Sequence, residues 1–139
     1  MPPIARSILA VAAGFLFIAV LAGGTGAALG AAGYLPANGE PMMDTGPVLL
    51  EAAYVALFAI AGCWLAARLA PSRPMRHALV LGLLGLAFNV VGAIATWGQR
   101  PDWAMLLNLA LVMPYAWLGG RLREMQLGRL RPGHVSAAA

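Results

Sequence analysis

The chain has 139 residues, of which 61% are hydrophobic and 10% charged, and its mean hydropathy is +0.79. Charged residues make up about a quarter of a typical soluble protein, and a soluble fold of this size could not bury so much apolar surface. The composition therefore excludes a soluble domain and predicts a polytopic membrane protein. Its net charge of +4 comes from nine arginines against five acids. We expect these arginines at helix ends, which excludes a nucleic-acid partner.

Four mostly apolar stretches are each long enough to cross a membrane, because a spanning helix needs about 20 residues. Short segments rich in proline and glycine separate them. We therefore predict an all-α membrane protein, an antiparallel bundle of four transmembrane helices, at about residues 7–33, 48–69, 77–97 and 103–121. These helices would form one transmembrane domain over residues 1–128. Residues 129–139 are predicted to be a disordered cytoplasmic tail.

Two segments allow a second interpretation. Leu29-Gly-Ala-Ala32 resembles a signal-peptide cleavage site, but the apolar stretch before it is longer than the core of a typical signal peptide. We therefore expect a spanning helix there. Residues 121–130 could form a short basic helix lying on anionic lipid. The simpler interpretation, which we favour, is that their arginines only anchor the topology.

The arginines predict the orientation of the helices. Arg100 alone follows the third span, whereas eight others gather at the opposite helix ends: Arg6, Arg68, Arg73, Arg76, Arg121, Arg123, Arg129 and Arg131. By the positive-inside rule, both termini are expected in the cytoplasm, with the protein in the inner membrane of a bacterium. The tryptophans agree with this arrangement, since they fall at the predicted interfaces. The expected interface anchors are Trp64, Trp97, Trp103, Trp117, Arg68 and Arg121.

Small residues recur at three- and four-residue spacing in the predicted helices. Such stripes let helix backbones approach closely in lipid. The glycines expected to pack between helices are Gly23, Gly26, Gly30, Gly82, Gly85 and Gly92. On the third span, the large neighbours of this stripe are expected to face lipid or a partner: Leu81, Leu84, Phe88 and Val91.

Five polar side chains fall in the outer half of the predicted bundle. Polar groups are energetically costly inside a membrane, so the presence of each one there needs an explanation. They are Glu51, Tyr54, Asn89, Asn108 and Thr25. One hypothesis is that they converge on a pocket in which Glu51 carries a proton or binds a cation. The structural alternative, which we favour, is that the two asparagines hydrogen-bond across helices. Glu51 would then be solvated or paired with Arg100.

The sequence predicts no catalysis, no metal and no cofactor. The single Cys63 cannot form an internal disulfide or a thiolate metal site. His77 and His134 lie outside the apolar stretches, so no pair of membrane-buried histidines can hold a haem. Met42 and Met43 are soft ligands that would suit copper, but without a nearby His or Cys we expect them to be ordinary loop residues. We find no nucleophile with a neighbouring base.

We predict a small structural or accessory membrane protein that packs through its Gly/Ala stripes, either as a homo-oligomer or as a subunit of a complex. We also expect the lipid bilayer as a partner of this protein. The alternative is a dimeric transporter, or a protein that binds lipid, quinone or a cation around Glu51. Four helices in this length are also typical of small multidrug resistance exporters. Their essential glutamate lies in the first helix, which has no charge here, so their activity is not carried over.

Overall fold

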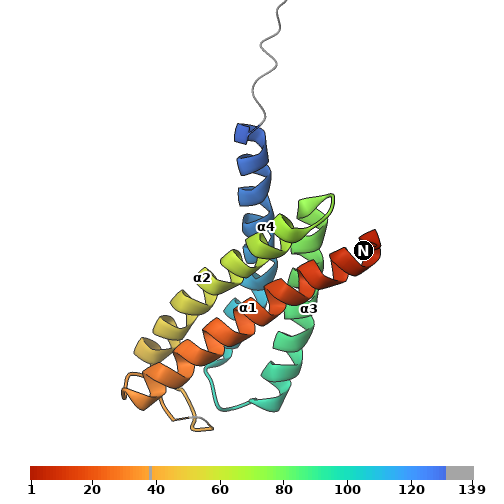
Figure 1. Cartoon of the computed structure of the whole chain (residues 1–139). Helices are drawn as coiled ribbons and strands as arrows, with labels where there is room; N and C mark the ends of the chain where they lie inside the picture. The colour runs from red at the N-terminus through yellow and green to blue at the C-terminus, as the bar shows by residue number, and fades with distance from the viewer. Residues whose placement is uncertain (38, 131–139) are drawn as a thin grey trace, which may run out of the picture.

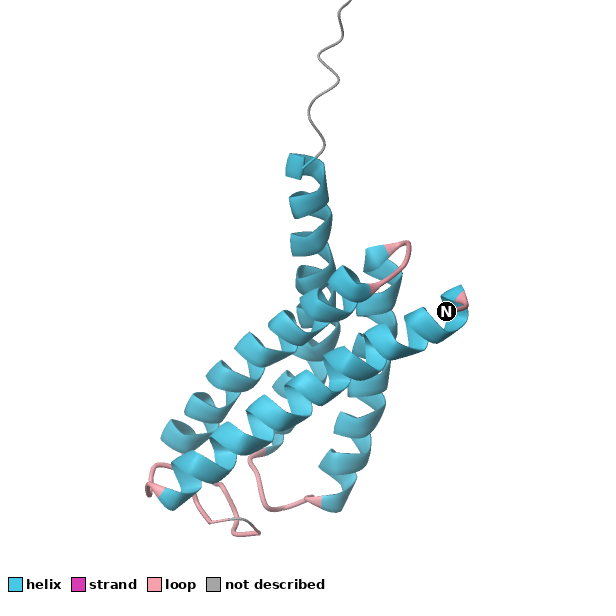
Figure 2. Cartoon of the chain, in the orientation of Figure 1, coloured by secondary structure: helices cyan, strands magenta, loops and turns pink. Residues whose placement is uncertain are grey.

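The computed structural model describes residues 1–37 and 39–130 of the chain. Helices account for nearly all of this part, and short loops join them (Figure 2). The four helices are α1 (Pro3–Ala31), α2 (Thr45–Leu69), α3 (Pro74–Ala95) and α4 (Asp102–Leu130). Each is long and apolar enough to cross a membrane. The prediction of an all-α bundle of four such helices is therefore confirmed.

Two of the three loops lie at one end of the bundle, and the third loop lies at the other end with the N-terminus and the end of α4 (Figure 1). The described residues of the α1–α2 loop (32–37 and 39–44) and the α3–α4 loop (96–101) lie at one end, which we call the loop end. The N-terminus, the α2–α3 loop and the last turns of α4 lie at the other, which we call the terminal end. Helix α2 packs against the other three helices, whereas α1 and α4 do not touch.

Helix α4 is longer than the predicted span of 103–121, since it continues to Leu130 as one helix. Its last turns extend beyond the other helices (Figure 1). Residues 121–130 are polar enough to leave a membrane, but they consist mainly of good helix formers. Hydropathy indicates where the membrane-spanning part of a helix ends, but the helix itself can continue beyond that point. The expected separate basic helix is therefore part of α4, and so are Arg129 and Leu130 of the predicted tail; residues 131–139 lie outside the described residues.

The main core lies between the helices toward the terminal end. Its buried side chains are almost all small: Cys63, Ala66, Ala67, Ala78, Leu81 and Ala116. Glycines bring the backbones together there. A Cβ atom on Gly14 of α1 would lie 2.7 Å from the carbonyl oxygen of Gly62 in α2. One on Gly119 of α4 would lie 2.6 Å from the Cβ of Cys63. This half of the bundle is held by close van der Waals packing of small residues.

The six glycines predicted at helix contacts differ in how closely atoms of other residues approach them. Gly82 is packed tightly against Ala116. Gly26, Gly30 and Gly85 have a neighbour 3.0 to 3.7 Å from where a Cβ would lie, whereas Gly23 and Gly92 have no atom of the described residues within 4 Å. Contacts comparable in tightness to that of Gly82 also involve glycines that the stripes did not single out: Gly14, Gly62, Gly119 and Gly120.

Leu81 is a clear correction to the predicted lipid-facing side of the third span. Its side chain is only 2% exposed, and it lies against Gly14 of α1. Leu84, Phe88 and Val91 are exposed in this chain, as expected. The difference arises because α3 contacts α1 near Gly14, and a helix buries more than one stripe where it meets two neighbours.

Candidate functional site

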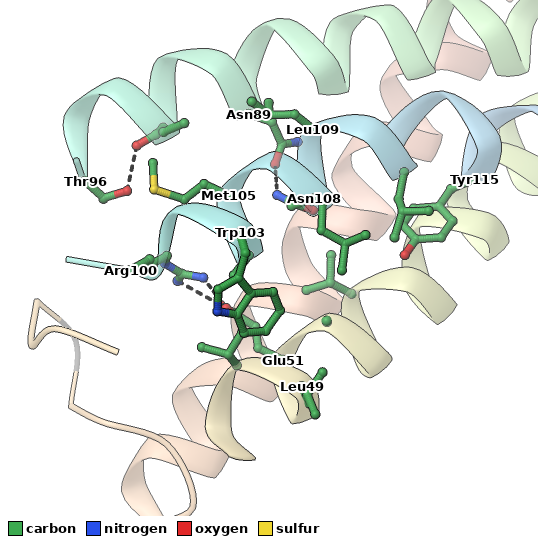
Figure 3. Close-up of a pocket in the computed structure, with 18 of the residues that line it drawn as sticks. Leu49, Glu51, Asn89, Thr96, Arg100, Trp103, Met105, Asn108, Leu109 and Tyr115 are labelled. Atoms are coloured by element: carbon green, nitrogen blue, oxygen red, sulfur yellow. Dashed lines mark hydrogen bonds and ion pairs between the residues drawn. The ribbon is translucent and has the colours of Figure 1, made fainter. Parts of the chain in front are cut away.

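A cavity of about 390 Å³ lies between α2, α3 and α4, toward the loop end (Figure 3). Most of its wall is apolar, from residues such as Val48, Val55 and Leu111. The polar and aromatic side chains that line it are Glu51, Phe88, Asn89, Thr96, Arg100, Trp103, Asn108 and Tyr115. The structure therefore brings three of the five predicted polar residues, one from each helix, to a single cavity.

Glu51 of α2 forms an ion pair with Arg100 of the α3–α4 loop. Arg100 Nη2 donates a hydrogen bond of 3.0 Å to Glu51 Oε1, and Nη1 donates a second one to Oε2. Such two-bond pairing fixes the relative position of both side chains. The hydrogen bond to Glu51 raises the pKa of the Arg100 guanidinium, although partial burial opposes this effect. The side chains are 22% and 37% exposed, so the pair lies at the edge of the bundle.

Asn89 and Asn108 form a second link, between α3 and α4. Asn108 Nδ2 donates to Asn89 Oδ1 at 2.6 Å, and Asn89 Nδ2 donates to the carbonyl oxygen of Gly85 at 2.7 Å. Figure 3 shows the two amides facing each other beside the cavity. Asn108 is exposed, and its Oδ1 accepts no hydrogen bond from the described residues. The pair joins α3 to α4, and it leaves the amide oxygen of a cavity-lining residue without a partner among the described residues.

Tyr54 and Thr25, the other two predicted members, do not line this cavity. Tyr54 lies toward α1, with its hydroxyl 3.0 Å from the position that a Cβ on Gly26 would take. Its ring lies 6.2 Å from that of Phe58. Thr25 is on α1, which contributes no residue to the cavity. Tyr54 and Thr25 thus lie outside the cavity, and it does not hold all five polar residues.

Three further residues that line the cavity are Thr96, Trp103 and Tyr115. Thr96 donates its hydroxyl to the carbonyl oxygen of Gly92 in its own helix, at 2.8 Å. Trp103 lies beside the ion pair, and Tyr115 lies far along α4 from Arg100 (Figure 3). The sequence analysis assigned Trp103 only to an interface and did not link Tyr115 to any site. A usable signal did exist for Arg100, because it is the one arginine outside the main arginine set.

The predicted interface anchors contact polar groups or remain exposed. Trp64 Nε1 donates to Gln126 Oε1 at 2.9 Å, which ties α2 to the extension of α4. The Arg68 guanidinium lies 5.2 Å from the centre of the Trp64 ring, a cation–π distance. Arg121 pairs with Glu124 at 3.5 Å. The remaining tryptophans are exposed: Trp97, Trp103 and Trp117.

The two methionines considered as copper ligands differ in burial. Met42 is buried with Leu35 and Val48, and its backbone N–H donates to the carbonyl oxygen of Gln99 at 2.8 Å. Met43 is 56% exposed. In residues 1–37 and 39–130, no three His, Cys, Asp or Glu side chains gather as they would around a metal ion. Met42 therefore joins the two loops of the loop end.

Comparisons of the chain with protein families, with curated proteins and with solved structures found no match. The assignment of function therefore rests on the geometry. That geometry is of a small integral membrane protein with four candidate spans, whose polar side chains pair with one another around a cavity.

Proposed function

We propose that this protein is a structural or accessory membrane protein without catalysis of its own, packing as a homo-oligomer or as a subunit of a membrane complex. The observation that carries this proposal is the two-bond pairing of Glu51 with Arg100. The carboxylate considered as the centre of a proton or cation site has both oxygens engaged by a fixed guanidinium. Such a carboxylate is better suited to joining α2 to the α3–α4 loop than to exchanging an ion during transport.

The surface of the bundle supports packing against another chain. Gly23 and Gly24 of α1 and Gly92 of α3 have no atom of the described residues within 4 Å of where a Cβ would lie. Glycine in a spanning helix exposes backbone, and its usual use is close contact with another helix. Because the contacts within this chain do not use these three glycines, they are available to a second copy or to a partner subunit.

We also propose that the terminal end faces the cytoplasm, with the protein in a bacterial inner membrane. The described arginines support this orientation. Arg6, Arg73 and Arg76 lie in or near the first turn of a helix at the terminal end, and only Arg100 lies at the loop end. An excess of arginine marks the cytoplasmic side of a membrane protein.

Native mass spectrometry from a mild detergent tests the packing proposal. The wild-type chain is expected as one defined oligomer or heteromeric complex. Gly23→Leu and Gly92→Leu are expected to reduce that complex, because leucine would occupy the contact. Gly128→Leu is the matched control, since Gly128 of α4 also has open space around it but lies beyond the apolar part of the helix. A monomer alone, or a complex unaffected by both substitutions, would contradict the proposal.

A second candidate function is the binding of an amphipathic small molecule, such as a lipid or a quinone, in the cavity. The open Oδ1 of Asn108 favours it. Asn108 lies about 7 Å along α4 from Trp103, a depth at which a polar group without a partner is costly. A ligand that donates one hydrogen bond there and places an apolar part against Val55 and Leu111 would fit the lining.

Analysis of an organic extract of the purified protein separates the two candidates. A stoichiometric compound that is lost on Asn108→Leu and kept on Thr25→Val would establish ligand binding. Thr25 is the matched control, because it is a polar residue of the same half that does not line the cavity. An extract without such a compound, or one retained equally by both variants, would remove the second candidate and leave the first untouched.

A further inference from the structure

A second hollow of this chain lies on the other side of the bundle, between the first half of α1 and the first half of α3. It is a groove of about 910 Å³. Its walls are apolar, from side chains such as Ile8, Val11 and Ala12 of α1 and Val80, Leu83 and Leu84 of α3. Phe15 and Phe88 also line it, and their rings meet with centres 5.1 Å apart. This contact closes the groove toward the middle of the bundle.

The length of the groove matches one leaflet of a membrane. Arg76 and Phe88, which line its two ends, are twelve residues apart on one helix, a rise of about 18 Å. The hydrocarbon core of a bilayer is about 30 Å thick, so one leaflet contributes about half of that. The groove therefore runs from the headgroup level at the terminal end to about the centre of the bilayer, which is the depth that one acyl chain occupies.

The open end of the groove carries positive charge. Arg76, His77 and Ser7 line it there, and no acidic side chain lines the groove. Within the described part of the chain, Arg76 forms no ion pair, because the ion pairs found there involve Arg100 and Arg121. His77 Nδ1 donates to the carbonyl oxygen of Arg73 at 3.2 Å, which fixes the ring at the start of α3. An arginine and a histidine above an apolar channel suit a phosphate with an attached hydrocarbon chain.

We propose that this groove binds one acyl chain of an anionic phospholipid from the leaflet at the terminal end, with the lipid phosphate at Arg76. The apolar walls exclude a polar occupant, and the cationic opening selects an anionic headgroup over a zwitterionic one. This site shares only Phe88 with the cavity at Glu51, and it depends only on the location of the protein in a membrane. It does not depend on the proposed accessory function.

The test is lipid retention measured by native mass spectrometry. The protein is reconstituted in nanodiscs with equal amounts of dioleoyl phosphatidylglycerol and dioleoyl phosphatidylcholine, and is then released in mild detergent. The wild type is expected to retain one phosphatidylglycerol in preference to phosphatidylcholine. Arg76→Gln is expected to lower that retention about tenfold, the effect of losing one hydrogen bond to a charged group. Arg129→Gln is the matched control, because it removes the same charge from the exposed end of α4.

A second pair of variants tests the acyl chain independently of the charge. Ala12 is exposed and lines the groove, so Ala12→Phe is expected to fill it and to abolish retention of either lipid. Ala27→Phe adds the same ring to an exposed position of α1 outside the groove and is expected to change nothing. Both positions are exposed, and thermal unfolding of the variants verifies that each is folded.

Three results would overturn the proposal. Equal losses for Arg76→Gln and Arg129→Gln would show that the charge acts only over long range. Retention unchanged by Ala12→Phe would show that no chain occupies the groove. Loss of a protein dimer on Ala12→Phe, with no lipid retained by the wild type, would show that a second copy fills the groove instead.

Discussion

The two ends of this bundle are held together in different ways. Toward the terminal end, glycine and alanine bring the helices into close contact, and the core contains no polar side chain. Toward the loop end there is a smaller apolar cluster of Leu35, Met42 and Val48. Polar contacts are added to it there: Glu51 with Arg100, and Asn108 with Asn89. A cavity remains between the helices there. In a membrane, where the hydrophobic effect does not drive helices together, close packing and interhelical hydrogen bonds are the two available means. This chain combines them: packing of small residues dominates the main core, and the polar pairs gather around the cavity.

The largest loss of stability is expected from a substitution at Gly14, in the tightly packed half of the bundle. A Cβ there would lie 2.7 Å from the carbonyl oxygen of Gly62, a backbone atom that cannot move aside without shifting α2. Gly14→Leu is expected to lower the free energy of unfolding by about 3 kcal/mol, as overpacking of a tight core does. Thermal unfolding in detergent measures the change.

Gly23→Leu supplies the control for this prediction. Gly23 lies on the same helix with open space around it, and its substitution is expected to leave the unfolding temperature of the monomer unchanged. Because leucine has a higher helix propensity than glycine, equal destabilisation by both variants would contradict the assignment of the effect to packing at Gly14.

A smaller effect is expected from the ion pair. Glu51→Gln removes a charge from a pair whose side chains are partly exposed, so the expected loss is about 1 kcal/mol. Reversing the pair, with Glu51→Arg and Arg100→Glu in one chain, is expected to recover part of that loss. A double-mutant cycle on unfolding measures the coupling. A coupling energy near zero would mean that the pair does not join α2 to the α3–α4 loop.

The smallest effect is expected at the asparagines. Asn108→Leu removes one interhelical hydrogen bond, which is worth about 0.6 kcal/mol in a membrane protein. Asn89→Leu in the same chain is expected to add little to this loss, because the shared bond is already absent. Fully additive losses in denaturant unfolding would show that the two amides act separately.

The helices were predictable from the sequence, and so was a partner for Glu51. Long apolar stretches between turn residues define the four helices, since hydropathy acts locally along the chain. Arg100 was named as a partner because it is the one arginine outside the main arginine set, and Glu51 is an acid at the start of a span. The orientation in the membrane, which depends on the same arginines, stays a prediction.

The contact points and the cavity were not predictable in the same way. Glycine stripes correctly singled out Gly82, but they also singled out Gly23 and Gly92, which have open space around them, and missed the close contacts of Gly14, Gly62 and Gly119. Which glycine meets a neighbour depends on where two helices cross, and no single helix encodes its crossing point. The burial of Leu81 follows from the same crossing. Thr25 lies apart from the cavity because α1 contributes no residue to it. Tyr54 of α2 does not line the cavity either, and its hydroxyl lies near Gly26 of α1.

The most direct test of the different packing at the two ends is a distance measurement between spin labels. Labels at Leu50 and Val91 report on α2 and α3 toward the loop end, and labels at Leu69 and Val80 report toward the terminal end; all four side chains are exposed. Cys63 is replaced by alanine in every chain. Double electron–electron resonance is expected to show that Glu51→Gln broadens the first distance distribution and leaves the second unchanged. An unchanged first distribution, or an equal change in both, would contradict the account.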